Sequence, residues 1–331
     1  MTSSGVDSRA LKKRKASSDG HDAADCSSIV KSSKFWFHDG SVVLQTPTKQ
    51  YRIHSSVLSA HSSVFEGMFQ VPQPEGEPTI EGCPIIPVVD ASEDWDTLLG
   101  VLYHSERMYL PKSSVLTVEA MLAFLRLGEK YNFDNFETEA LDQLKIIFPD
   151  TLAGWKRLLD DKADVELGYL VNREFRIVRA LEDLRIQTAL PMAYFICICG
   201  RSTLDTTTGK DIPDGPAYLS QETRNRLLIA KQQILEQYPR KNFWPLWNPL
   251  PTDCESKTEC GNRMRLYMAN ILLDPEVHCA IAPDDDFKTE GGLCAVCRKH
   301  CSDAQQTGRQ FMFNALPSFF DLPPWGELRD F

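Results

Sequence analysis

The stretch of sequence that decides the fold covers residues 51–69 and reads Tyr51-Arg52-Ile53-His54-Ser55-Ser56-Val57-Leu58-Ser59-Ala60-His61-Ser62-Ser63-Val64-Phe65-Glu66-Gly67-Met68-Phe69. Its first three residues read as a short strand, and the apolar residues after Ser55 fall on one face of a helix. The sequence therefore predicts a strand over residues 51–53 that runs straight into a helix from about Ser55 to Phe69. A strand joined in this way to an apolar-faced helix is typical of the opening of a compact domain.

The segments on either side predict the rest of a small α+β domain. Residues 35–45 read as two short strands about a turn at Asp39-Gly40, because Asp-Gly is a dipeptide well suited to positive φ. Four elements follow downstream: a strand over residues 85–90, a helix over residues 95–102, a helix after an N-cap at Thr117, and a last helix that starts with the capping-box pair Asp134 and Glu137. We expect one core to bury Leu58, Phe65, Leu99, Leu122 and Leu125.

The order of residue types in residues 51–69 resembles the signature of the BTB/POZ domain. In that family an apolar-His pair is followed by an apolar-Leu pair, a Ser, an aromatic residue and a Met-Phe end. The matching residues are Ile53-His54, Val57-Leu58, Ser62, Phe65 and Met68-Phe69. The resemblance extends over residues 34–148 and implies a small sheet covered by a helical cluster, in a protein that binds other proteins.

Two further positions extend the resemblance, and two segments depart from it. Asp39 matches the Asp of the family, and Leu102-Tyr103 matches its Leu-Tyr segment. Ser55 stands where many relatives carry Lys or Arg beside the His, and the loop over residues 71–78 is rich in proline. The complete set of expected signature residues is Asp39, His54, Leu58, Ser62, Phe65, Phe69, Leu102 and Tyr103.

Three functions are consistent with this resemblance. The first is a non-catalytic interaction protein that forms a homodimer through the BTB domain, because the strand Phe35–Phe37 is very apolar for an unpaired edge. The second is a substrate adaptor of a cullin-type ubiquitin ligase, although residues 68–87 contain no clean copy of the apolar-x-Glu element that such adaptors usually carry. The third is a nuclear transcriptional regulator.

The chain outside the BTB-like segment divides into a tail and a second region. Residues 1–33 are rich in Ser, Asp and Ala and are expected to be disordered. Within them Lys12, Lys13, Arg14 and Lys15 form a basic cluster, which is either a nuclear import signal or a solvated charge run. Residues 149–331 are expected to be mainly helical, with an N-cap at Ser220, and with a loop over residues 205–216.

Ten cysteines in a chain that shows no secretory signal indicate a reducing compartment, in the nucleus or the cytoplasm. Two pairs stand out, Cys254-x5-Cys260 and Cys294-x2-Cys297, separated by 33 residues. They are read as a structural zinc site, as unligated thiols or as a redox pair, and His300 and Cys301 are reserve ligands. This C-terminal segment also resembles the tail that follows BTB domains in many basidiomycete fungal proteins.

Composition and motifs disfavour other classes of function. Among 331 residues, 42% are hydrophobic, but no apolar run approaches the ~20 residues of a membrane span. The net charge of −10 disfavours nucleic acid as a partner. Motifs of hydrolases, metalloproteases and nucleotide-binding enzymes are missing from the sequence, so we expect no catalytic activity and no cofactor apart from the zinc considered above.

Overall fold

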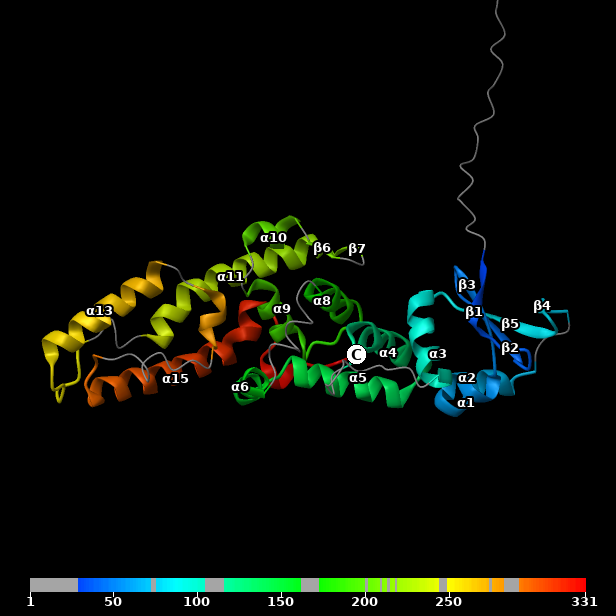
Figure 1. The fold of residues 1–331 in the computed structure, drawn as a ribbon, viewed down its shortest axis with the longest axis horizontal. Helices are drawn as coiled ribbons and strands as arrows, with labels where there is room; N and C mark the ends of the chain where they lie inside the picture. The colour runs from blue at the N-terminus through cyan, green and yellow to red at the C-terminus, as the bar shows by residue number, and fades with distance from the viewer. Residues whose placement is uncertain are drawn as a thin grey trace, which may run out of the picture.

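A five-stranded sheet lies at one end of the elongated molecule, and helices make up most of the rest (Figure 1). The structure is a computed structural model, and it describes residues 29–72, 76–104, 116–161, 173–199, 202–208, 210–212, 215–217, 219–243, 249–273, 276–282 and 292–331. Within these residues, no helix combines the length and the apolar character that crossing a membrane requires. This arrangement confirms the predicted fold class of an α+β domain followed by a mainly helical region.

The sheet has the order β1-β3-β2-β5-β4. Its strands are β1 (Val30–Trp36), β2 (Val42–Gln45), β3 (Lys49–Ile53), β4 (Thr79–Ile80) and β5 (Cys83–Pro87). The predicted hairpin of the first two strands is wrong, because β3 lies between β1 and β2 and pairs with β1 in parallel and with β2 in antiparallel orientation. The first strand also begins at Val30, ahead of the boundary expected at residue 34.

Gly40 is required in the connection between β1 and β2 for a reason other than the predicted one. Positive φ occurs among the described glycines at Gly76, Gly82 and Gly292 and not at Gly40. A Cβ atom at Gly40 would instead lie 2.8 Å from Cγ of Arg52 and about as close to the backbone of that residue. The close approach of β3 therefore excludes a side chain at this position.

The strand β3 leads directly into a helix, as predicted, but the helix does not run unbroken to Phe69. It is divided into α1 (Ser55–His61) and α2 (Ser63–Gln70) by the extended backbone of Ser62, whose φ is −142°. The Ser62 Oγ caps α2 by accepting a hydrogen bond from the backbone N–H of Phe65, and it donates one to the carbonyl oxygen of Tyr131. A polar side chain with two partners thus marks the break between the two helices.

Three longer helices complete the first domain: α3 (Ser92–His104), α4 (Val118–Tyr131) and α5 (Asp134–Ile147). Thr117 caps α4 as predicted, because its Oγ1 accepts a hydrogen bond from the N–H of Ala120. The capping box predicted at Asp134 and Glu137 is wrong, since α5 begins without a side-chain cap after Phe133. The five core residues named from the sequence are all buried in one cluster, which confirms that prediction.

The second region is built around two long helices, α11 and α15, which run in opposite directions in Figure 1. Its elements are α6 (Leu152–Asp161), α8 (Glu174–Asp183), α9 (Leu190–Ile198), α10 (Thr203–Thr208), β6 (Lys210–Ile212), β7 (Gly215–Ala217), α11 (Gln221–Asn242), α13 (Lys257–Leu273), η1 (Val277–Ala280), α15 (Ala295–Phe319) and η2 (Trp325–Glu327). The loop predicted over residues 205–216 is wrong, because this segment contains the short helix α10 and the antiparallel pair β6 and β7. Ser220 caps α11 as predicted.

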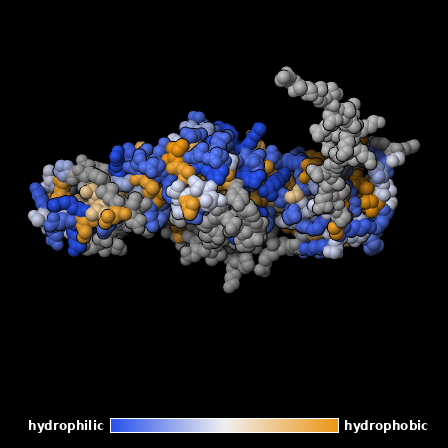
Figure 2. Space-filling model, turned by 90° about the horizontal axis from the view of Figure 1, so that it is seen from above, coloured by the Kyte–Doolittle hydropathy of each residue, from blue (hydrophilic) through white to orange (hydrophobic). Residues whose placement is uncertain are grey.

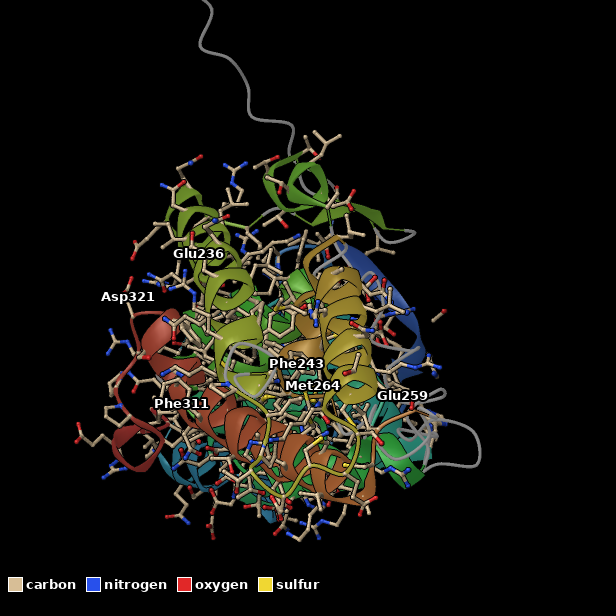
Figure 3. All side chains as sticks on the ribbon, turned by 90° about the vertical axis from the view of Figure 1, so that its left-hand side faces the viewer. Glu236, Phe243, Glu259, Met264, Phe311 and Asp321 are labelled. Atoms are coloured by element: carbon tan, nitrogen blue, oxygen red, sulfur yellow. The ribbon has the colours of Figure 1, made fainter. Side chains whose placement is uncertain are left out.

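Close backbone contact joins α11 and α15. A Cβ atom at Gly308, in the middle of α15, would lie 2.4 Å from the carbonyl oxygen of Lys241 and 2.5 Å from Cα of Asn242 at the end of α11. Glycine is therefore the residue that allows the two helices to cross at this distance. In Figure 3, which looks at the molecule from the end far from the sheet, Phe243 and Met264 lie between α11, α13 and α15.

Candidate interaction surface and cysteine cluster

Three of the eight signature residues form the interior of the first domain. Leu58 and Phe65 are fully buried, and Ser62 is nearly so. The ring of Phe65 stacks on Tyr131 at 5.1 Å and meets Trp95 edge-on at 6.0 Å. These residues hold α2 against α3 and α4, so their role is structural.

Three other signature residues meet at the surface beside the turn after β1. Nε2 of His54 lies 3.3 Å from Oδ1 of Asp39, and the backbone N–H of His54 donates a 2.9 Å hydrogen bond to the Tyr103 hydroxyl. The ring of Phe37 stacks on Tyr103 at 4.8 Å. We call Phe37, Asp39, His54 and Tyr103 the aromatic–carboxylate cluster.

Electrostatics in this cluster favour a charged Asp39. A hydrogen bond from its own backbone N–H, and then the His54 ring, hold the pKa of the Asp39 carboxyl below its usual value. Burial raises the pKa of the Tyr103 hydroxyl, which therefore stays neutral as a hydrogen-bond partner. Asp39 itself is mostly exposed, so the cluster presents one carboxylate on a base of half-buried rings.

Ser55 does not replace the missing cation of the family pattern. Its backbone N–H donates a 2.9 Å hydrogen bond to Oγ of Ser41, and the two hydroxyls lie 3.0 Å apart. The remaining signature residues, Phe69 and Leu102, are half-buried and pack against the core. The eight residues are thus divided between the core and one surface cluster.

The four cysteines of the two predicted pairs come together at the end of the molecule farthest from the sheet. The Sγ atoms of Cys254, Cys260, Cys294 and Cys297 all lie within 4.8 Å of one another. We call these four residues the cysteine cluster. Cys254 precedes α13, Cys260 lies in its first turn, Cys294 is the N-cap of α15 and Cys297 lies in its first turn. Figure 1 shows the starts of α13 and α15 at the same end of the chain's long axis.

Backbone hydrogen bonds and burial act in opposite directions on the thiols of the cysteine cluster. The backbone N–H groups of Cys297 and Glu255 lower the pKa of the Cys294 thiol to about 6. Burial raises the pKa of Cys297, and it also raises that of Cys260. Among Cys260, Cys294 and Cys297, the thiol of Cys294 therefore ionises most readily.

The reserve ligands and a second group of donor atoms lie outside the cysteine cluster. Cys301 follows Cys297 by one turn of α15, is buried, and has a pKa that burial raises to about 12. His300 is half-buried on the same helix and does not belong to the group of four sulfurs. At η1, Glu276, His278 and Cys279 bring three further donor atoms within the same distance of one another, at an exposed position.

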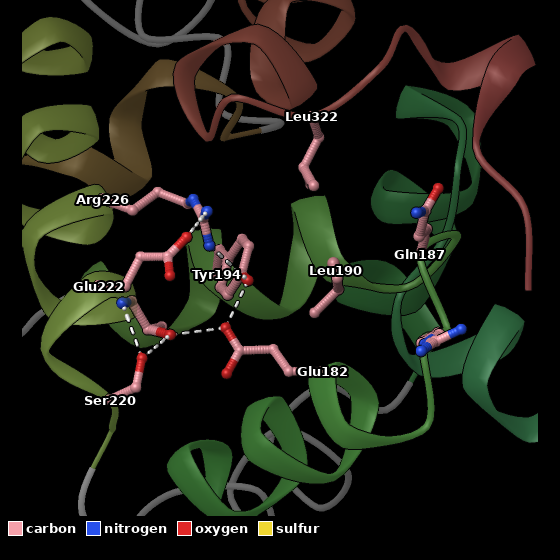
Figure 4. Close-up of a pocket in the computed structure, with 10 residues that line it drawn as sticks. Glu182, Gln187, Leu190, Tyr194, Ser220, Glu222, Arg226 and Leu322 are labelled. Carbon is pink, nitrogen blue, oxygen red and sulfur yellow. Dashed lines mark hydrogen bonds and ion pairs between the residues drawn. The ribbon is translucent and has the colours of Figure 1, made fainter. Parts of the chain in front are cut away.

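A cavity of about 370 Å³ lies between α8, α9 and α11 (Figure 4). Its polar groups are paired with one another: the hydroxyls of Tyr194 and Thr223 donate to Oε1 of Glu182 at 2.6 and 2.7 Å, and Arg226 donates to Glu222 at 2.9 Å. No sequence pattern indicated this network, because its members come from the three separate helices α8, α9 and α11. The pairing indicates a structural network that joins these helices.

The basic cluster Lys12, Lys13, Arg14 and Lys15 lies outside the described residues.

Just before Cys294, Gly292 has a positive φ of 119°. A Cβ atom there would also lie 2.5 Å from Nε of Arg263, a neighbour that the sequence did not indicate.

Comparison with known proteins identifies the first of the two regions. Residues 31–145 match the family model described as BTB/POZ domain. No curated protein and no solved structure matches the chain. The matched residues contain the sheet, α1 to α4 and most of α5, together with all eight signature residues. The chain therefore contains a BTB/POZ domain, a member of a family of protein-interaction modules, followed by a mainly helical region.

Proposed function

We propose that this chain is a non-catalytic interaction protein that forms a homodimer through its BTB/POZ domain. The observation that carries the proposal is the position of β1, which lies at the end of the strand order and pairs with β3 on one side. An edge strand presents backbone N–H and C=O groups that can pair with another strand. A second copy of the same edge is the simplest partner, because most oligomers are symmetric.

The burial of the β1 side chains changes the argument for a dimer that the apolar segment Phe35–Phe37 suggested. Phe35 is fully buried and its ring lies 6.2 Å from that of Tyr51 in the same chain, so it does not need a partner molecule to cover it. Apolar surface remains at the start of the strand, where Val30 is 57% exposed. The proposal therefore rests on the open edge and on Val30 rather than on the segment Phe35–Phe37.

Light scattering of the purified full chain tests this proposal. We expect a mass of twice the 37.5 kDa of one chain at micromolar concentration. Val30→Asp places a charge at the open edge and should shift the protein to monomer. Val89→Asp is the matched control, because Val89 is 83% exposed and lies beyond β5. A wild-type monomer, or equal loss of dimer in both variants, would contradict the proposal.

The two alternative functions lead to different partners. A substrate adaptor binds a cullin, and a pull-down with the full chain scored for cullin tests this directly. A nuclear regulator needs import, and replacement of Lys12, Lys13, Arg14 and Lys15 by Ala tests the basic cluster through the distribution of the tagged chain between nucleus and cytoplasm. We also propose that the C-terminal region is related to the tail that follows the BTB domain in basidiomycete proteins.

A further inference from the structure

The helix α13 has few buried side chains to hold it in place. Among the α13 residues whose burial is described, Cys260 and Met264 are buried and Tyr267 and Met268 are half-buried against the core, whereas Leu266 and Leu273 are largely exposed. An apolar patch among hydrophilic residues is visible at this end of the molecule in Figure 2. Most helical stability in proteins comes from packing of an apolar face, so a helix of 17 residues with this pattern depends on its few anchors. One of its two buried side chains, Cys260, belongs to the cysteine cluster.

The positions of the four sulfurs fit one tetrahedral metal ion. Zinc binds thiolate sulfur at about 2.3 Å, which places the sulfurs of a tetrahedral site about 3.8 Å apart. The observed upper limit of 4.8 Å requires only a small contraction. Each half of the site comes from one short segment at the start of one helix, so a bound ion would join α13 to α15.

The hydrogen bonds of the sulfurs distinguish this cluster from a buried thiol elsewhere. The backbone N–H of Cys294 donates to Sγ of Cys260 at 3.3 Å, so that sulfur is a hydrogen-bond acceptor. In the first domain, Sγ of Cys83 lies 3.0 Å from the carbonyl oxygen of Gly40 and donates to it, as a protonated thiol does.

The surroundings balance the charge that such a site would carry. Four thiolates and one divalent cation have a net charge of about −2. The positive N-terminal ends of α13 and α15 both face the cluster. Arg263 packs against Gly292, and Arg298 donates a 3.3 Å hydrogen bond to the carbonyl oxygen of Leu293, so two guanidinium groups hold the turn that leads into Cys294.

From these observations we infer that Cys254, Cys260, Cys294 and Cys297 bind one structural Zn²⁺ ion that fastens the start of α13 to the start of α15. The ion adds a second attachment to the limited apolar packing of α13. Metal binding is then part of the folding of this end of the chain. The five-stranded sheet of the BTB/POZ domain and the cysteine cluster lie at opposite ends of the molecule (Figure 1), so we expect this domain to keep its fold when the ion is removed.

The first test is elemental analysis of the full chain, purified in buffers that contain zinc and no chelator. We expect about one zinc per chain in the wild type, and less than about half an equivalent in Cys260→Ser and in Cys297→Ser. Cys279→Ser is the matched control, because Cys279 belongs to the separate group at η1 and should keep the full content. Cys301→Ser should also keep it, since the inference gives Cys301 no bond to the ion.

A second measurement does not depend on how the variants fold. Exchange of cobalt(II) into the wild type should produce the thiolate-to-cobalt charge-transfer bands and the ligand-field bands of a tetrahedral site. Removal of the metal with a chelator should increase hydrogen exchange in residues 254–273 and 294–301 and leave residues 31–145 unchanged. Wild-type protein without bound metal, cobalt spectra of an octahedral site, or loss of zinc from Cys279→Ser would each overturn the inference. The mass of the chain by light scattering reports on the proposed homodimer independently of these results.

Discussion

The backbone N–H of Cys294 donates a hydrogen bond to Sγ of Cys260 at 3.3 Å, across 34 positions of the sequence. This bond joins the N-cap of α15 to the first turn of α13. Both helices therefore begin at one point in space, and the chain between them leaves this point and returns to it. The turn through Gly292 makes the return geometrically feasible.

We expect Gly292→Ala to destabilise this end of the chain. An alanine at this position would have to adopt a φ of 119°, and its Cβ atom would have to displace Arg263. We therefore expect the free energy of unfolding to fall by about 1–3 kcal/mol. Gly326→Ala is the control, because a Cβ atom at Gly326 would meet nothing within 4 Å. Thermal unfolding of both variants measures the difference, and equal melting temperatures would contradict the assigned role of Gly292.

Gly308→Ala should weaken the crossing of α11 and α15. The new Cβ atom would overlap the carbonyl oxygen of Lys241 at 2.4 Å, and backbone atoms cannot yield as a flexible side chain can. We expect a loss of about 1–3 kcal/mol, as for other overpacked sites. Gly67→Ala, in α2 and with open space around its Cα, should instead gain about 0.5–1 kcal/mol. Chemical denaturation of the two variants gives the comparison, and a stabilising Gly308→Ala would disprove it.

Replacement of Ser62 tests the break between α1 and α2. Ser62→Ala removes the cap of α2 and leaves the carbonyl oxygen of Tyr131 without this donor, so we expect a loss of about 1–2 kcal/mol. Ser56→Ala, at an exposed position in α1, should change stability by less than about 0.5 kcal/mol. The urea midpoints of the two proteins measure the difference. A midpoint of Ser62→Ala equal to that of Ser56→Ala would show that the cap is dispensable.

The buried carboxyl of Asp94 predicts a pH dependence of stability. Burial raises its pKa above the usual value of 3.8, although the Arg126 guanidinium, 3.2 Å from Oδ1, opposes the shift. The folded state therefore holds this proton more tightly than the unfolded state. Its contribution to stability is fully present below pH 3.8 and is lost as the pH rises through the folded pKa.

Asp94→Asn removes this titration. The free energy of unfolding of the variant should increase relative to that of the wild type as the pH is raised from 3.8 through the folded pKa. Asp142→Asn is the control, because the Asp142 side chain is largely exposed. Denaturation curves at a series of pH values give the result. A difference that stays constant with pH, or that changes in the opposite direction, would refute the assignment.

Local patterns in the sequence predicted those parts of the structure that depend on neighbouring residues. The strand Tyr51–Ile53, the start of α1 and the caps at Thr117 and Ser220 all follow from residues within one or two turns. The closely spaced cysteines likewise indicated which thiols share a segment, and the structure brings the two pairs together.

Long-range contacts explain several features that the sequence did not predict. The break at Ser62 depends on the carbonyl oxygen of Tyr131, 69 positions away. The pairing of β1 with β3 is parallel and joins segments that a hairpin pattern would leave apart. The glycine requirement at Gly308 arises from Lys241 on another helix. A single sequence does not display which distant backbone will approach a given residue.

The division of the cysteine cluster into two halves has a consequence for the recognition of related chains. Each half fixes its own two sulfurs through local spacing, Cys-x5-Cys before and within α13 and Gly-x-Cys-x2-Cys at the start of α15. Residues 274–291, between the end of α13 and Gly292, supply none of the four sulfurs, so insertions and deletions there leave both spacings unchanged. A search pattern for relatives should therefore keep the two short spacings strict and leave the length of the intervening segment free.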